Sequence, residues 1–364
     1  MKKYLLISII SLTLFGIIMI YSSSYIWASY KYNNPYKYLI NQSIFALLGF
    51  ILMYIVSKID YHIYEKCANK ILLGSIILLI LVLIPGIGTI RNGSRSWFGI
   101  GGFGIQPSEF TKLALIIFTS KYLVNNYDNM SYFKKGLMPI LIIVFMVFLL
   151  IMLQPDFGTG TIIVMSVMGL LFIGGMNLKF IYKGILIGIV LIVGLILIAP
   201  YRLQRILSFL NPWSDPLGSG FQIIQSLYAI GPGGLLGMGF GNSIQKHFYL
   251  PEPQTDFIFS IISEEFGFMG VLIVSGLFLL LIISGFMISK KSIDMFGKYL
   301  SYGITFQVAF QTILNLMVVV GLIPVTGVTL PFLSYGGSSL LITLLSMGIL
   351  LNISKNIIDI RTNV

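Results

Sequence analysis

The stretch KHFYLPEPQTDFIFSIISEE, residues 246–265, decides the fold, because it leads from polar residues directly into a long apolar run. That run, residues 257–289, exceeds the roughly 20 residues that a helix needs to cross a bilayer. A carboxylate within hydrocarbon costs about 2.5–3.5 kcal/mol at mid-bilayer on insertion scales unless it has a partner or a task. Asp256 stands at the edge of the run and is therefore the first candidate for a functional group.

The composition of the whole chain is that of a membrane protein. Of 364 residues, 57% are hydrophobic and 10% are charged, with a mean hydropathy of +0.94. Soluble domains carry roughly 25% charged residues. We therefore expect one all-α polytopic domain over residues 1–364, with a large extracellular loop at about 201–256 between helices 7 and 8. Ten spans are predicted, near 4–22, 39–57, 71–86, 108–125, 137–153, 158–176, 181–200, 257–289, 299–323 and 332–354. The eighth is long enough to hold a lead-in segment before a span that begins at about Phe266.

The net charge of +11 does not indicate nucleic-acid binding. Most lysines fall in short segments between the predicted spans, on the side where the positive-inside rule places the cytoplasm. Both termini are therefore predicted to be cytoplasmic.

Several cations lie on the opposite, outer side, where that rule disfavours them. Arginine offers a planar fork of donors that suits phosphate and carboxylate groups. These cations are candidate ligands for an anionic substrate, the alternative being ordinary loop residues balanced by nearby acids. They are Arg91, Arg95, Lys112, Arg202, Arg205 and Lys246.

The outer segment at about 87–108 combines an interfacial tryptophan with a helix start. Trp97 suits the membrane interface, where its ring is half apolar and its N–H stays hydrated. Its glycines match G-x-G-x-x-G, but the strand–turn–helix unit that this motif requires is not predicted, so dinucleotide binding is rejected. Glu109 and Lys112 are three residues apart on one face of the fourth span, either as a structural ion pair or facing a ligand.

Two further outer segments carry acidic candidates. Asp156 either caps the sixth helix or meets an outer arginine. The loop at 201–256 has a helical-looking piece at 221–230 and then closely spaced glycines, and a loop of this length is more often functional than not. Glu252 lies near the end of that loop. In the ninth span Gln307, Gln311 and Asn315 share a face, which favours interhelical hydrogen bonds.

The sequence excludes several kinds of chemistry. It holds no Cys/His cluster for zinc, no nucleophile elbow and no P-loop. Outer cations with one well-placed carboxylate suit a lipid-linked phosphate or pyrophosphate: the cations stabilise a leaving pyrophosphate, and Asp256 accepts a proton from an attacking hydroxyl.

Several long motifs resemble the SEDS family (shape, elongation, division and sporulation), and the likeness covers nearly the whole chain. They are GNSIQK at 241–246, YLPE at 249–252, TDFIF at 255–259, SRSW at 94–97, QPSEFTK at 106–112, QPDFG at 154–158 and LPFLSYGGSS at 330–339. Residues 211–216 and 253–255 look closer to the FtsW/SpoVE branch than to RodA.

The resemblance implies a peptidoglycan glycosyltransferase at the outer face of the bacterial cytoplasmic membrane. Such an enzyme polymerises lipid II onto a lipid-linked nascent glycan and releases undecaprenyl pyrophosphate. The family's essential aspartate falls on Asp256 and its tryptophan motif on Trp97. A class B penicillin-binding protein as partner and a divalent cation (Mg or Mn) as cofactor are family expectations. The metal's ligands are left unknown. Two rival readings remain open: a lipid II flippase, and a scaffold that recruits a transpeptidase.

Overall fold

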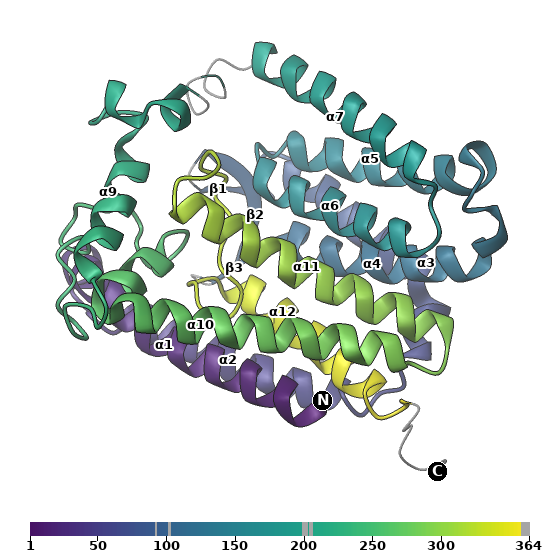
Figure 1. Ribbon diagram of the computed structural model, residues 1–364, viewed down its shortest axis with the longest axis horizontal. Helices are drawn as coiled ribbons and strands as arrows, with labels where there is room; N and C mark the ends of the chain where they lie inside the picture. The colour runs from purple at the N-terminus through teal and green to yellow at the C-terminus, as the bar shows by residue number, and fades with distance from the viewer. Residues whose placement is uncertain (92, 101–102, 199–202, 204–206, 358–364) are drawn as a thin grey trace.

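The computed structural model describes residues 1–91, 93–100, 103–198, 203 and 207–357, and in these residues the chain is mostly helical (Figure 1). Shorter helical turns cover Tyr127–Asn129, Phe133–Leu137, Pro212–Ser214 and Gly231–Gly233. The longer helices are α1 (Lys2–Tyr32), α2 (Lys37–Val56), α3 (His62–Leu83), α4 (Pro107–Asn125), α5 (Met138–Met152), α6 (Phe157–Ile173), α7 (Leu178–Ile198), α9 (Phe221–Ile230), α10 (Ile258–Lys291), α11 (Met295–Val319) and α12 (Gly337–Ile353).

These helices make the chain a multi-pass membrane protein. Among the described residues, six helices are long and apolar enough to cross a bilayer: α1, α2, α3, α5 with its preceding turn, α10 and α11. Helices α6 and α12 are apolar but shorter. Large apolar side chains such as Leu47 and Leu73 are about as exposed as polar ones would be in a soluble protein, at 63% and 60%, as expected where lipid is the solvent. The count of ten crossings stays a prediction.

Each predicted span corresponds to a helix, but several boundaries differ. Helix α1 continues to Tyr32, and α3 already begins at His62. The last helix begins at Gly337 rather than near residue 332, because residues 330–335 form a turn in which the Tyr335 amide and the Ser334 hydroxyl donate to the carbonyls of residues 254 and 255. The start of α1 and the end of α12 lie toward the same end of the bundle (Figure 1), as predicted for termini on one side.

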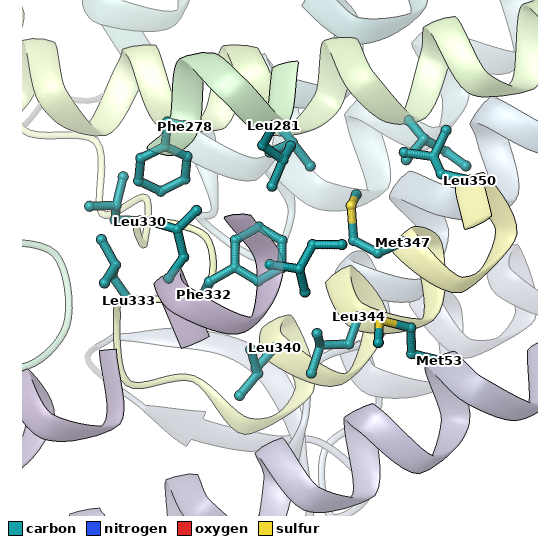
Figure 2. Packing of buried hydrophobic residues seen from close by; sticks show 14 of the residues in the cluster. Met53, Phe278, Leu281, Leu330, Phe332, Leu333, Leu340, Leu344, Met347 and Leu350 are labelled. Carbon is teal, nitrogen blue, oxygen red and sulfur yellow. The ribbon is translucent and has the colours of Figure 1, made fainter. Parts of the chain in front are cut away.

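One of the two buried apolar clusters lies where α1, α2, α10 and α12 meet the turn before α12, and the other packs α3 to α6 together. Figure 2 shows apolar side chains of the first cluster, including Phe278 of α10 and Met347 of α12, which are at most 2% exposed. Backbones approach closely at Gly16 of α1, where a Cβ would lie 2.5 Å from the carbonyl oxygen of Phe332. Any larger residue there would force α1 away from this turn.

Helix α10 is broken at Gly267, whose φ of 61° and ψ of −157° are accessible essentially only to glycine. The break leaves helix carbonyls and amides without intrahelical partners, and the glycine-rich segment 233–239 supplies them. The amides of Met238 and Gly239 donate to the carbonyls of Glu264 and Glu265 at 2.9 and 3.0 Å. The carbonyls of Gly234 and Leu235 accept from the amides of residues 268 and 269 at 2.9 and 3.1 Å. The predicted division of the eighth span near Phe266 is confirmed.

The outer segments differ in part from expectation. The predicted helical piece at 221–230 is confirmed as α9. The sequence predicts no strand in the segment between the third and fourth spans, yet that segment holds a three-stranded antiparallel sheet of β1 (Thr89–Arg91), β2 (Ser94–Ile100) and β3 (Phe103–Ile105), in the order β1-β2-β3. Gly99 and Gly104 pair across β2 and β3. Glycine weakens the strand signal in a sequence, yet here it permits close approach, since a Cβ on Gly99 would lie 3.0 Å from the Thr89 side chain.

Candidate functional site

Asp256 lies directly before α10 in a short segment whose backbone is held from one side. Its carbonyl accepts a hydrogen bond from Nδ2 of Asn315 at 2.7 Å. The carbonyl of Thr255 accepts from Oγ of Ser334 at 2.6 Å, and that of Gln254 accepts from the amide of Tyr335 at 2.8 Å. Three consecutive carbonyls are therefore bound by α11 and by the turn before α12, which leaves this backbone little freedom.

The Asp256 side chain is half-buried and faces the loop between α11 and α12. Its Oδ2 would lie 3.8 Å from a Cβ placed on Gly327, which has a φ of 73°. Val328, the next residue of this loop, accepts the second N–H of Asn315 at 2.7 Å. The same asparagine thus fixes the loop and the aspartate backbone to each other.

A buried ion pair lies at the start of α4. Lys112 Nζ is 2.9 Å from Glu109 Oε2, and both residues are at most 5% exposed. Lys112 also donates to Oε1 of Gln311 at 3.0 Å, whose Nε2 donates to the carbonyl of Thr329 at 3.0 Å. The predicted pair is confirmed, and it reaches the same loop that adjoins Asp256.

Asp156 caps the N-terminus of α6, one of the two alternatives that the sequence left open. Its Oδ1 accepts from the amide of Thr159 at 3.1 Å and its Oδ2 from Nε2 of Gln106 at 2.9 Å. Burial raises the pKa of this carboxyl, the nearby charge of Glu109 raises it further, and the Thr159 hydrogen bonds oppose the rise. Asp156 and the Glu109–Lys112 pair therefore form one charged group at the N-terminal ends of α4 and α6.

Lys246 lies in a different environment from the other candidate cations. It is fully buried, and its Nζ is 2.9 Å from Glu265 Oε1, 2.6 Å from the carbonyl oxygen of Gly241 and 3.3 Å from Ser22 Oγ. The Ser22 hydroxyl is also 2.6 and 2.8 Å from the two carboxylate oxygens of Glu265. These contacts favour a structural role for Lys246, joining the outer loop to α1 and α10.

Glu264 holds the same loop. Its carboxylate accepts from the amide of Ile244 at 2.8 Å and from Oγ of Ser243 at 2.5 Å. Glu264 and Glu265 therefore hold residues 243 and 244 of the loop against α10.

The remaining predicted site residues lie in β2, in the segment before Asp256 or outside the described residues. Arg95 and Trp97 lie in β2, opposite Ile90 and Thr89, and both are half-buried. Strand β2 is tied to the turn between α5 and α6, because Ser94 and Ser96 donate to the carbonyl of Gln154. Glu252 is exposed and has a φ of 45°. Arg202 and Arg205 fall outside the described residues, as does the Arg91 side chain.

Sequence reasoning missed the residues that hold the aspartate segment. The sequence places the amides of α11 on one face, and Gln311 does bond across to α4 through Lys112. Asn315 instead binds loop backbone, and Ser334 stands within the motif at 330–339 with nothing that marks it as a contact of residue 255. Their only signal in the sequence is the four-residue spacing of the amides and the length of the motif at 330–339.

Known proteins resemble this chain over almost its entire length. A family model described as "Cell cycle protein", which groups FtsW, RodA and SpoVE, matches residues 3–358. Stage V sporulation protein E of Bacillus subtilis is 52% identical over 354 residues, covering 96% of each chain. A probable peptidoglycan glycosyltransferase FtsW of Geobacter sulfurreducens is 40% identical over 353 residues, covering 97% of this chain and 95% of the relative.

Solved structures share the fold. A structure reported as "Structural coordination of polymerization and crosslinking by a peptidoglycan synthase complex" matches with a TM-score of 0.79 and 29% identity over 96% of both chains. The crystal structure of the Thermus thermophilus rod shape determining protein RodA matches with a TM-score of 0.69 and 26% identity, over 98% of this chain and 97% of the other. The chain therefore belongs to the family of cell cycle proteins that comprises FtsW, RodA and SpoVE, the SEDS family.

Proposed function

We propose that this chain is a peptidoglycan glycosyltransferase that polymerises lipid II at the outer face of the bacterial cytoplasmic membrane. Its relatives include proteins named as probable peptidoglycan glycosyltransferases. The observation that carries the proposal is the Asp256 carboxylate, which stands at the entrance to a spanning helix on a backbone bound through three consecutive carbonyls. A base held in this way is oriented before substrate arrives, and preorganisation of this kind is what proximity catalysis requires.

In the proposed reaction, Asp256 accepts the proton of the acceptor sugar's 4-hydroxyl as the hydroxyl oxygen attacks the anomeric carbon of the donor. The bond from that carbon to the pyrophosphate breaks, so transfer proceeds with inversion and undecaprenyl pyrophosphate leaves. Arg95, Arg202 and Arg205 are proposed to bind pyrophosphate as a group, with Trp97 and Glu252 lining the substrate region. Lys112 is proposed to contribute positive charge from the start of α4, where Glu109 pairs with it and Asp156 lies nearby.

A divalent cation is part of the proposal. Among the described residues, no group of three His, Cys, Asp or Glu side chains comes together. Mg²⁺ commonly binds one or two carboxylates together with substrate phosphates rather than an all-protein cage, and Asp256 with the substrate's phosphates fits that mode. Such an ion would neutralise charge on the leaving pyrophosphate.

The proposed partner is a class B penicillin-binding protein, which would crosslink the glycan that this chain polymerises. One solved relative is a synthase complex that couples polymerisation and crosslinking. The rival flippase reading needs a charged path across the membrane. Within the described part of the chain, the charged candidates Glu109, Lys112 and Asp156 gather at the N-terminal ends of α4 and α6 instead, the ends that we propose face outward.

The test is polymerisation of purified lipid II by the purified protein, with and without the transpeptidase, measured as glycan product and released undecaprenyl pyrophosphate. Asp256→Asn is expected to lower the rate by about 10²–10⁴-fold, which is the usual contribution of a general base. Asp215→Asn is the matched control, because Asp215 is an exposed aspartate of the same outer loop whose carboxylate accepts from the nearby Ser219. An Asp256→Asn protein that polymerises at the wild-type rate would refute the assignment, and lipid II translocation without product would favour a flippase.

A further inference from the structure

We infer that Ser334 and Asn315 are positioning residues for Asp256, acting through its backbone as a clamp on residues 254–256. The inference deepens the proposed function and rests on it. The clamp is defined as Asn315 of α11 with Ser334 and Tyr335 of the turn before α12.

The side-chain donors and acceptors of the clamp match the backbone groups that they contact. Both contacts of Asn315 are to carbonyl oxygens, those of Asp256 and Val328, each at 2.7 Å. Only the amide nitrogen can donate twice, so the orientation of this side chain is determined. Ser334 Oγ donates to the carbonyl of Thr255 at 2.6 Å and accepts from the amide of Leu330 at 2.8 Å, which uses both capacities of a hydroxyl.

The clamp is itself anchored in the bundle. Gln42 of α2 is fully buried, donates to the carbonyl of Ser334 at 3.2 Å and accepts from the amide of Gly336 at 3.3 Å. Asn315 and Ser334 are at most 5% exposed. Helices α2 and α11 therefore fix the position of the turn, and the turn fixes the backbone that carries the carboxylate.

The contact of Ser334 differs from those of several buried serines in the helices, which donate only to carbonyls of their own helix. Ser346 of α12 is one example: it is 2% exposed, and its hydroxyl donates to the carbonyl of Ile342 at 2.8 Å. Ser334 instead reaches across the fold to a residue 79 positions away, adjacent to Asp256. The two serines differ in what they hold, not in their size or burial.

This difference supplies matched pairs for the experiment. Ser334→Ala is compared with Ser346→Ala. Asn315→Ala is compared with Asn352→Ala, since Asn352 is also buried and donates to a carbonyl, that of Ser57 at 3.0 Å, in the turn that joins α2 to α3. Each purified variant is assayed for lipid II polymerisation, for its unfolding midpoint and for backbone hydrogen exchange in a peptide covering residues 254–259.

Ser334→Ala and Asn315→Ala are expected to lower kcat by about tenfold to a hundredfold with little change in KM, as for a reacting group displaced by up to an ångström. They are also expected to speed exchange at residues 254–259. The controls should keep kcat within about twofold at a similar loss of midpoint. Equal kcat losses in each matched pair, or unchanged exchange in the Ser334→Ala and Asn315→Ala proteins, would overturn the inference. A wild-type protein that makes no glycan would instead overturn the proposed function, while the exchange measurement still decides whether the clamp exists.

Discussion

The buried contact between Lys246 and Glu265 gives a quantitative test of what holds the outer loop. Both side chains are fully buried, and the nitrogen lies 2.9 Å from Glu265 Oε1. At an effective dielectric constant of about 20, two unit charges at this separation attract by about 6 kcal/mol, most of which offsets their desolvation. Lys246→Met would leave the carboxylate buried with only Ser22 and the amide of Ser243 as donors. We expect that variant to lose about 3–5 kcal/mol of unfolding free energy.

Changing the other partner, by Glu265→Gln, should cost less unfolding free energy than Lys246→Met. After Glu265→Gln, the ammonium keeps the carbonyl of Gly241 at 2.6 Å and the hydroxyl of Ser22 at 3.3 Å. The double variant Lys246→Met/Glu265→Gln buries no charge at this point, so we expect its stability to lie within about 1 kcal/mol of wild type.

The assay is denaturant unfolding of the purified protein in detergent, followed by circular dichroism and analysed as a double-mutant cycle. Lys31→Met serves as the control, because Lys31 is an exposed lysine at the C-terminal end of α1, and it should change stability by less than about 0.5 kcal/mol. The reasoning is wrong if Lys246→Met is as stable as Lys31→Met, or if the double variant is no more stable than the single one.

Three further outcomes follow from the described contacts. Gly267→Ala should lose at least about 3 kcal/mol of unfolding free energy in the same assay, since the φ of Gly267 is 61° and the new Cβ would lie 2.4 Å from the amide nitrogen of Gly237. Gly276→Ala is the control: this glycine of α10 has open space around its Cβ position, so the variant should be neutral or stabilising. Equal losses in the two variants would contradict the argument. The raised pKa of Asp156 means that the folded state holds this proton more tightly than the unfolded state does. The stability of the wild-type protein should therefore fall as the pH rises from about 4 through the folded-state pKa. Asp156→Asn should flatten that pH dependence, measured as unfolding temperatures recorded across pH. Lys112→Met should destabilise the protein by about 3–5 kcal/mol, and Lys112→Met/Glu109→Gln should recover most of that loss. If Lys112 also binds pyrophosphate, the stable double variant will still show a raised KM for lipid II. A normal KM would show that the ion pair has a structural role only.

Much of the architecture is local information, and the sequence therefore predicts it. Hydropathy along each segment determines which residues enter lipid, so the helices, the division of the eighth span near Phe266 and α9 are visible without a structure. The edge position of Asp256 is likewise a property of its immediate neighbours. The small outer sheet was missed because its strands are three to seven residues long and rich in glycine, which removes the periodic signal of a strand.

Only the tertiary structure decided which polar groups meet. Lys112 and Lys246 look alike as outer cations in the sequence, yet one reaches the loop beside Asp256 through Gln311 and the other is buried against Glu265. The partner that Ser22 finds in Glu265 is 243 positions away, and no periodicity carries such a pairing. A buried polar group must find its complement wherever packing brings one. The sequence therefore predicts that Asp256 stands at the membrane edge, and the packing of α11 and the turn before α12 decided how its backbone is held.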